Sequence, residues 1–266
     1  MRTEGKRKAA VMSELIIRQI PVLKDNYVYL VHEPQSRATG VVDPSVAPPI
    51  LEAALREGWR ITHILNTHHH NDHTGGNREI KEATGCIIVG PRADRDRIPG
   101  IDVEVGDGDI YEFGAEKARV FDVPGHTRGH IAYHFANSHA LFCGDTLFIM
   151  GCGRVFEGTH AQMWNSLSKL KALPPETRVY CAHEYTQANA RFALTVEPEN
   201  RDLVARAATI DAMRAKGQST VPGTLAEEFK TNPFLRADLP ALQQAAGSPG
   251  DPVATFASIR TRKDKF

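Results

Sequence analysis

The chain has 266 residues, of which 41% are hydrophobic, and its 32 basic and 32 acidic side chains give a formal net charge of zero. This balance excludes the strong positive field that favours binding to nucleic acid or to an acidic membrane surface. No apolar run approaches the roughly 20 residues of a membrane-spanning helix, so we expect a globular protein that binds neither nucleic acid nor membrane.

Residues 1–11, MRTEGKRKAAV, are basic but lack the apolar core of a secretory signal peptide. We interpret them as a disordered extension upstream of the folded domain, with Met12 as the natural start. A weak transit segment is the alternative interpretation of the same residues.

The chain contains four cysteines, Cys86, Cys143, Cys152 and Cys181, with no C-x-x-C pair among them. Cys143 and Cys181 lie in apolar, strand-like runs, where a free cysteine behaves as a small hydrophobic residue. We therefore expect reduced thiols and a cytoplasmic protein.

The first two thirds of the chain is rich in strand-like runs. Short apolar or alternating segments bounded by turn residues predict strands at 15–22, 26–33, 38–44, 61–67, 86–90, 118–125, 130–135, 140–146 and 178–184. Proline at the start and Gly58 near the end predict a helix at 48–59, and further helices are expected at 77–85 and 160–173. Glycines between the alternating residues of 103–114 predict a β-hairpin.

After His183 the pattern becomes helical. Periodic apolar residues separated by proline and glycine predict helices at 186–196, 200–217, 223–229 and 251–266. We therefore predict a mixed strand and helix domain at 12–183, followed by a helical domain at 184–266 that packs against it.

The segment 66–76, NTHHHNDHTGG, gathers four histidines and an aspartate directly after the predicted strand 61–67. In an extended chain side chains alternate, so His68 and His70 point to one side while His69 points away. The alternation predicts that His68 and His70 can share a metal ion and that His69 is not a ligand.

Asp72 and His73 follow in a turn into the next helix, where adjacent side chains diverge, so this pair can serve a second metal. Neither pair completes a site, because a metal needs three or more protein ligands. The missing ligands are predicted at other strand ends, where His126, Asp145 and His183 each terminate a buried-looking run. Asp145 considered alone would be an ordinary turn residue. It is a candidate ligand only because histidines end other strands in the same way.

The pattern T-H-x-H-x-D-H, here THHHNDH, resembles the signature of the metallo-β-lactamase superfamily. The resemblance implies an αββα sandwich with two metals at one edge of its sheets. It assigns His68, His70 and His126 to the first metal, Asp72, His73 and His183 to the second, and Asp145 to a bridge between them. It also gives Asp43, in VVDP, a supporting role behind the ligands. For His130, which lies between glycine and β-like residues, we favour a supporting or packing role over ligation.

Longer motifs resemble one branch of this superfamily, the hydroxyacylglutathione hydrolase (glyoxalase II) family. They are KDNYVYL, GCGRVFEGT, CAHEYTQANARFALTVEPEN, NPFLR and the terminal IRTRKDKF, and the resemblance runs from about residue 15 to the last residue. It implies hydrolysis of S-D-lactoylglutathione to glutathione and D-lactate, which serves methylglyoxal detoxification. The nucleophile would be a hydroxide that bridges two metals, oriented by Asp72.

The chemistry of a thioester is consistent with this site. Its leaving thiolate has a conjugate acid of pKa near 8.5, so it departs without a strong general acid. No G-x-S-x-G nucleophile motif is present.

Arg260 and Lys263 lie three residues apart on the predicted terminal helix and hence on one face. By itself this pattern is also typical of a solvated, frayed basic terminus. The resemblance favours recognition of the two glutathione carboxylates by Arg260 and Lys263. It adds Arg154, where the family often has lysine, and Tyr185 as further contacts.

The expected ligands are imidazole and carboxylate groups without a thiolate. We expect two divalent metals per chain, zinc first, with iron or manganese as alternatives at the second site, in a monomeric enzyme. One alternative function is a glutathione persulfide dioxygenase with a single iron, against which the basic pair on the tail argues. Another is a non-catalytic metal-binding module, against which the complete set of seven ligand positions argues.

Overall fold

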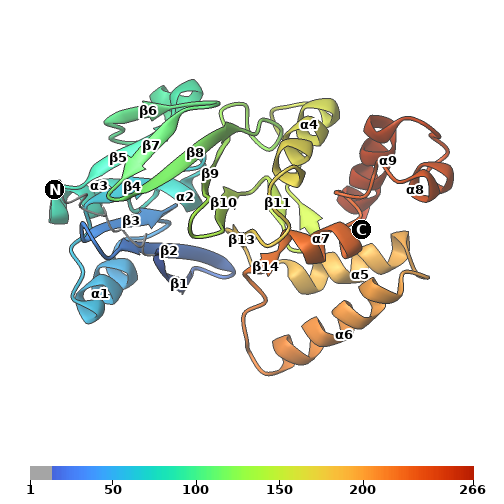
Figure 1. Cartoon of the computed structure of the whole chain (residues 1–266), viewed down its shortest axis with the longest axis horizontal. Coiled ribbons are helices and arrows are strands. Elements are labelled where there is room, and N and C mark those ends of the chain that lie inside the picture. The colour runs from blue at the N-terminus through green and yellow to red at the C-terminus, as the bar shows by residue number, and fades with distance from the viewer. Residues whose placement is uncertain (1–13) are drawn as a thin grey trace, which may run out of the picture.

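The structure, a computed structural model, describes residues 14–266 (Figure 1). The predicted extension at 1–11 and the start at Met12 lie outside the described residues. Within residues 14–266, no helix combines the length and the apolar character needed to cross a bilayer. All four cysteines are free and buried.

Two six-stranded sheets form the body of the molecule. The first has the order β1 (Ile16–Val22), β2 (Asn26–Glu33), β3 (Ala38–Val42), β4 (His63–Leu65), β5 (Ile87–Pro91), β6 (Val103–Val105). The second has the order β14 (Gly223–Thr224), β13 (Arg178–Cys181), β10 (Ala140–Gly144), β9 (Ile131–Phe135), β8 (Glu116–Asp122), β7 (Ile110–Phe113). A small hairpin of β11 (Leu147–Phe148) and β12 (Gly151–Cys152) lies beside the second sheet.

Every residue of β2 is buried, because this strand faces apolar partners on both sides. Tyr29 and Val31 point into the core between the sheets, where the Tyr29 ring lies 5.5 Å from that of Phe142 in the second sheet. Val28 and Leu30 point outward into a separate core, which two helices complete: α1 (Pro48–Glu57) and α3 (Asn77–Thr84).

On the second sheet, α4 (His160–Lys171) packs its apolar stripe of Met163, Leu167 and Leu170 into the main core. Its Ser166 hydroxyl donates to Pro124 O at 2.7 Å and so ties the helix to the end of β8. The layers are therefore helix, sheet, sheet, helix, which confirms the predicted αββα sandwich (Figure 1).

The predicted hairpin at 103–114 is wrong. Val103–Val105 pairs in parallel with β5 in the first sheet, whereas Ile110–Phe113 pairs antiparallel with β8 in the second. The turn residues between them carry the chain from one sheet to the other. The actual hairpin joins β7 to β8 through Gly114, whose φ of 62° suits glycine.

The tail beyond His183 carries five helices, α5 (Thr186–Val196), α6 (Arg201–Ala215), α7 (Leu225–Thr231), α8 (Pro240–Ala245) and α9 (Pro252–Lys265). They gather at one end of the sandwich (Figure 1). The helix predicted at 223–229 begins two residues later, because Gly223–Thr224 forms β14 on the edge of the second sheet. Thr224 and Glu227 then form a reciprocal capping box that starts α7. The regular structure of the tail is thus helical, apart from the two residues of β14 that extend the sandwich.

Candidate metal centre

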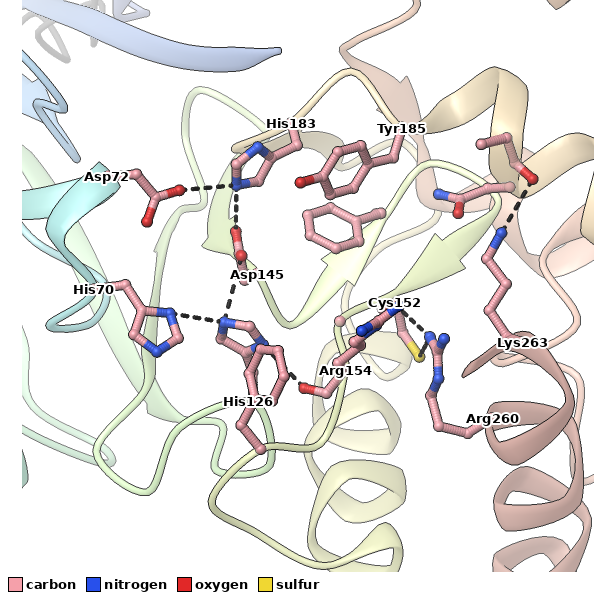
Figure 2. Close-up of a pocket in the computed structure, with 15 residues that line it drawn as sticks. His70, Asp72, His126, Asp145, Cys152, Arg154, His183, Tyr185, Arg260 and Lys263 are labelled. Atoms are coloured by element: carbon pink, nitrogen blue, oxygen red, sulfur yellow. Dashed lines mark hydrogen bonds and ion pairs between the residues drawn. The ribbon is translucent and has the colours of Figure 1, made fainter. Parts of the chain in front are cut away.

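Loops at one edge of the two sheets bring the predicted ligands together. His68 and His70 lie between β4 and the short helix α2 (Asn71–Thr74), which carries Asp72 and His73. His126 lies in the loop from β8 to β9, Asp145 directly follows β10, and His183 follows β13. In Figure 2 the labelled side chains of His70, Asp72, His126, Asp145 and His183 converge on one space.

Gly144 permits the close approach that places Asp145. Its φ is 47°, and a Cβ at this position would clash with the Thr67 hydroxyl oxygen. The turn therefore packs directly against the loop that leads into the histidine cluster.

His68, His70 and His126 form the first cluster. His70 Nδ1 lies 3.1 Å from His68 Nε2 and 3.1 Å from His126 Nε2. One ring nitrogen has either one proton or one lone pair, so His70 Nδ1 cannot pair fully with both neighbours. Nitrogen ligands at about 2.0–2.1 Å from a tetrahedral ion lie about 3.3 Å apart. The spacing of these three nitrogens therefore fits a bound cation.

Asp72, His73 and His183 form the second cluster. Asp72 Oδ2 lies 3.5 Å from His73 Nε2 and 3.5 Å from His183 Nε2. The three ligand atoms lie within 4.8 Å of one another, and His73 Nε2 is buried without a hydrogen-bond partner. A buried polar atom without a partner is costly unless a ligand satisfies it, and a cation at this point would do so.

Asp145 lies between the two clusters. Its Oδ1 is 3.5 Å from His73 Nε2 and 3.4 Å from His183 Nε2, while its Oδ2 is 3.4 Å from His126 Nε2. Asp145 Oδ1 is buried and lacks a hydrogen-bond partner. One carboxylate thus presents one oxygen to each cluster, as a bridge between two metals requires (Figure 2).

The far nitrogens of three histidines are held by acceptors. His73 Nδ1 lies 3.1 Å from Asp43 Oδ2, His183 Nδ1 3.0 Å from Asp25 Oδ1, and His126 Nδ1 2.9 Å from Arg154 O. With the proton on each Nδ1, the Nε2 lone pair faces inward and is free to bind a metal. Metal-binding histidines usually donate their other N–H to an acceptor in this way.

Asp43 lies close enough to His68 and His73 to be a candidate ligand itself. However, its two oxygens accept hydrogen bonds from Thr67 N at 2.7 Å, from the Thr67 hydroxyl at 2.6 Å and from His73. Because these donors occupy the carboxylate, the geometry favours the supporting role expected for Asp43.

Burial lowers the pKa of His68 well below its usual value, and burial also lowers the pKa of His70 and of His126. These three imidazoles stay neutral near pH 7, so each can offer a lone pair. Neutral imidazoles are the form that binds metal, and the first cluster is therefore prepared for a cation.

The second cluster has a different electrostatic character. Burial is the largest effect and lowers the pKa of His73 and of His183, but the neighbouring carboxylates together outweigh it and raise both. Asp145, Asp43 and Asp72 act on His73, while Asp145 and Asp25 act on His183. Burial raises the pKa of Asp145 and of Asp72, yet the neighbouring imidazoles dominate and hold both carboxyl pKa values far below their usual range. Protons on the His73 and His183 imidazoles balance the negative charge of the two carboxylates. A bound divalent cation would supply this positive charge in place of the protons.

His69 points away from both clusters, as the alternation predicts. Its Nδ1 lies 3.1 Å from Asp94 Oδ2, and its Nε2 lies 3.1 Å from Arg97 Nη1. His130 is buried, stacks on His68 with ring centroids 4.5 Å apart, and accepts from Asp145 N at 3.1 Å. Both residues therefore lie in supporting positions.

We expect His69→Ala to keep two metals per chain while lowering the free energy of unfolding by about 1–3 kcal/mol, because buried Asp94 loses a donor. Elemental analysis and urea denaturation check both parts. His70→Ala is the matched comparison and should lose metal from the first cluster. Metal loss in His69→Ala would contradict the assignment of His69 as a non-ligand.

A cavity of about 480 Å³ opens over the two clusters, and all four predicted substrate contacts line it (Figure 2). Tyr185 stacks on His183 with centroids 4.7 Å apart, and burial raises the pKa of its hydroxyl. Arg154 is exposed and lies 3.7 Å from Asp264. The tail and the metal-binding domain therefore both contribute to the wall of the cavity.

Arg260 and Lys263 form the wall contributed by α9. Arg260 is buried, donates to Cys152 O at 2.9 Å, pairs with Asp264 at 2.9 Å and leaves its Nε without a partner. Lys263 Nζ donates to Ala188 O at 3.1 Å, and burial, followed by the charge of Arg260, lowers its pKa to about 8. Neither side chain is part of a frayed terminus.

Sequence reasoning missed several residues around the centre. Asp25 and Asn26 contact His183 and Asp72, although the sequence motif that contains them suggested no role. Phe148 lies edge-on to His183 and Tyr185, with centroids 5.9 and 5.2 Å away. No local pattern distinguishes this phenylalanine from one in the core.

Two sequence families match the chain. Residues 24–183 match the family described as "Metallo-beta-lactamase superfamily", and residues 184–266 match "Hydroxyacylglutathione hydrolase C-terminus". A relative from Methylococcus capsulatus named "Hydroxyacylglutathione hydrolase" is 60% identical over 95% of this chain and 99% of its own length. A relative of the same name from Rhodospirillum rubrum is 59% identical over 96% of this chain and all of its own length.

Solved structures share the fold. ETHE1 from Myxococcus xanthus is 25% identical with a TM-score of 0.64, covering 93% of this chain and 98% of that one. TTHA1623, solved in a di-iron-bound form, is 24% identical with a TM-score of 0.58. The match covers 82% of this chain and 99% of that one. From the full-length relatives and the two family matches, we conclude that this chain belongs to the hydroxyacylglutathione hydrolase family, within the metallo-β-lactamase superfamily.

Proposed function

We propose that the chain hydrolyses S-D-lactoylglutathione to glutathione and D-lactate, and thereby serves methylglyoxal detoxification. The observation that carries this proposal is the position of Asp145, whose oxygens face both ligand clusters at the floor of a cavity. The opposite wall of that cavity carries the cationic side chains that a dianionic glutathione moiety requires. The relatives named hydroxyacylglutathione hydrolase support the same reaction.

Two divalent metals are proposed at the two clusters, with His68, His70 and His126 at the first, Asp72, His73 and His183 at the second, and Asp145 shared. The nitrogen and oxygen donors suit zinc, with iron or manganese as alternatives at the second site. When bound, such a pair polarises a carbonyl and lowers the pKa of a water molecule to about 7.

The chain's own residues then complete the chemistry. Asp72 lines the cavity and stays ionised, so it can accept a hydrogen bond from the attacking water and orient it. Tyr185 stays protonated and can donate a hydrogen bond to the substrate. The leaving thiolate requires no acid, which agrees with the lack of a protonated carboxyl among the two aspartates of the site.

The glutathione moiety is proposed to lie along α9. Lys263 and Arg154 present charge to the cavity, while buried Arg260 supports the wall through Cys152 O and offers its unpaired Nε. The ligands come from residues before 184 and the cationic wall mainly from residues after it, which supports a division into domains at 12–183 and 184–266. Because one chain completes the cavity, we propose a monomer, and the four free cysteines support a cytoplasmic location.

We expect KM for S-D-lactoylglutathione to rise as the pH passes upward through about 8, where Lys263 loses its proton. Lys263→Met should raise KM roughly 10- to 100-fold below that pH, as for a lost charged hydrogen bond, and should remove this step from the pH profile. Steady-state kinetics between pH 6 and 9.5 measure both. A simple alkyl thioester is the control, since its KM should not respond to Lys263. An unchanged KM in the variant would refute the proposed contact.

The decisive test combines elemental analysis of the purified protein with a turnover assay on S-D-lactoylglutathione. Two metals per chain and rapid hydrolysis are expected. Oxygen consumption with glutathione persulfide, together with a single iron, would instead indicate the dioxygenase. A full metal content without turnover of either substrate would indicate a non-catalytic module.

A further inference from the structure

We propose that residues 23–26, which are the turn between β1 and β2 together with the first residue of β2 and are called the turn below, position the ligands of the second metal and so set the affinity for that metal alone. The inference rests on the two-metal site proposed above. It concerns Asp25 and Asn26, two side chains that lie behind the ligands rather than among them.

Asp25 acts on His183. Its Oδ1 lies 3.0 Å from His183 Nδ1, so the carboxylate holds the proton on that nitrogen. His183 Nε2 is then left to face Asp72 and Asp145, at 3.5 and 3.4 Å. A carboxylate in this position also makes the imidazole a better electron donor toward a metal.

Asn26 acts on Asp72. This amide is buried, and its Nδ2 donates to Asp72 Oδ2 at 3.0 Å and to Asp72 O at 3.4 Å. Oδ2 is the same oxygen that faces His73 Nε2 and His183 Nε2. The hydrogen bond therefore selects which carboxylate oxygen points to the second metal and restricts rotation of the side chain.

Backbone contacts hold the turn against the segment that carries His183. Glu184 N donates to Asp25 O at 2.9 Å, and Tyr27 N donates to Ala182 O at 2.7 Å. Asn26 and His183 thereby form an isolated antiparallel bridge. The Tyr27 hydroxyl also donates to the buried Glu184 carboxylate at 2.8 Å. The turn is thus fixed directly to the ligand-bearing strand end.

The first cluster is supported elsewhere. His126 Nδ1 is held by Arg154 O, and His68 Nδ1 lies 3.1 Å from the Thr67 hydroxyl. Across residues 14–266, none of the hydrogen bonds of the turn reaches His68, His70 or His126. Loss of the turn's side chains should therefore weaken one metal and leave the other unchanged.

The experiment measures two zinc dissociation constants for the apoprotein by competition with a chromophoric chelator. For Asp25→Ala and Asn26→Ala we expect one of the two constants to rise roughly 10- to 100-fold, as for other supporting residues, while the other changes less than about threefold. Asp25→Asn keeps an oxygen acceptor and should lose less. Lys24→Ala, whose side chain makes no hydrogen bond or ion pair within the described residues, is the matched control and should bind both metals normally.

Equal weakening at both sites with a lower melting temperature of the apoprotein would show a merely structural turn and overturn the proposal. So would unchanged constants in all variants, or a wild-type chain that binds a single zinc. The titration uses no substrate, so failure of the proposed thioesterase activity would leave its outcome intact. Conversely, if the wild type is active but the variants weaken both zinc sites equally, the role of the turn is refuted while the proposed function stands.

Discussion

Asp145→Ala is expected to abolish thioester hydrolysis, with kcat falling on the order of 10³-fold or more, and to remove metal from both clusters together. The reason is the position of one carboxylate whose oxygens lie 3.4 Å from His126 Nε2 and 3.4 Å from His183 Nε2. Losing a single preorganised electrostatic group in an active site already costs about 10²–10³ in kcat. Here the same substitution also removes a ligand from both proposed ions.

Asp145→Asn separates these effects. The amide keeps the shape and one oxygen but cannot ligate through its nitrogen, so we expect one retained metal and a partial loss of activity. Elemental analysis, turnover of S-D-lactoylglutathione and the circular dichroism of the apoprotein measure the three consequences. A folded Asp145→Ala variant that keeps two metals and wild-type turnover would refute the bridging role.

Much of the candidate site could be predicted because its geometry follows from local rules. Side-chain alternation separates His69 from its two neighbours, and the structure places His69 against Asp94 instead. Polar residues that end buried strands converge at a sheet edge, which is why Asp145 and His183 meet although they lie far apart in sequence. These rules need only strand periodicity and the direction of each strand.

The rest depends on contacts that no local pattern specifies. The glycines in 103–114 are compatible with a hairpin and equally with a crossover between the two sheets. Only the long-range pairing of β6 with β5 and of β7 with β8 determines which of the two forms. The roles of Asp25 and Asn26 arise because the first turn meets the end of β13 in space. The burial of Arg260 likewise depends on a hairpin more than a hundred residues away.

We expect Glu228→Ala to lower the free energy of unfolding by about 3–5 kcal/mol, the usual cost of breaking a buried ion pair. Glu228 on α7 is fully buried and lies 2.7 Å from Arg206 Nη2. It also accepts from Met150 N at 2.7 Å and from Asn232 Nδ2 at 2.9 Å. Alanine would leave the largely buried Arg206 guanidinium with only the more distant Glu227, at 3.8 Å, as an acidic partner. It would also remove the acceptor of Met150 N.

This glutamate connects the tail to the cavity. Met150 lies in the β11–β12 hairpin, which contributes Phe148 and Cys152 to the cavity wall. Urea denaturation should show a lower midpoint with an unchanged slope. Glu228→Gln keeps an acceptor and should cost less, and Glu82→Ala, at an exposed position on α3, should stay within about 0.5 kcal/mol of wild type. If Glu228→Ala were as stable as Glu82→Ala, the docking of the tail would rest on apolar packing alone.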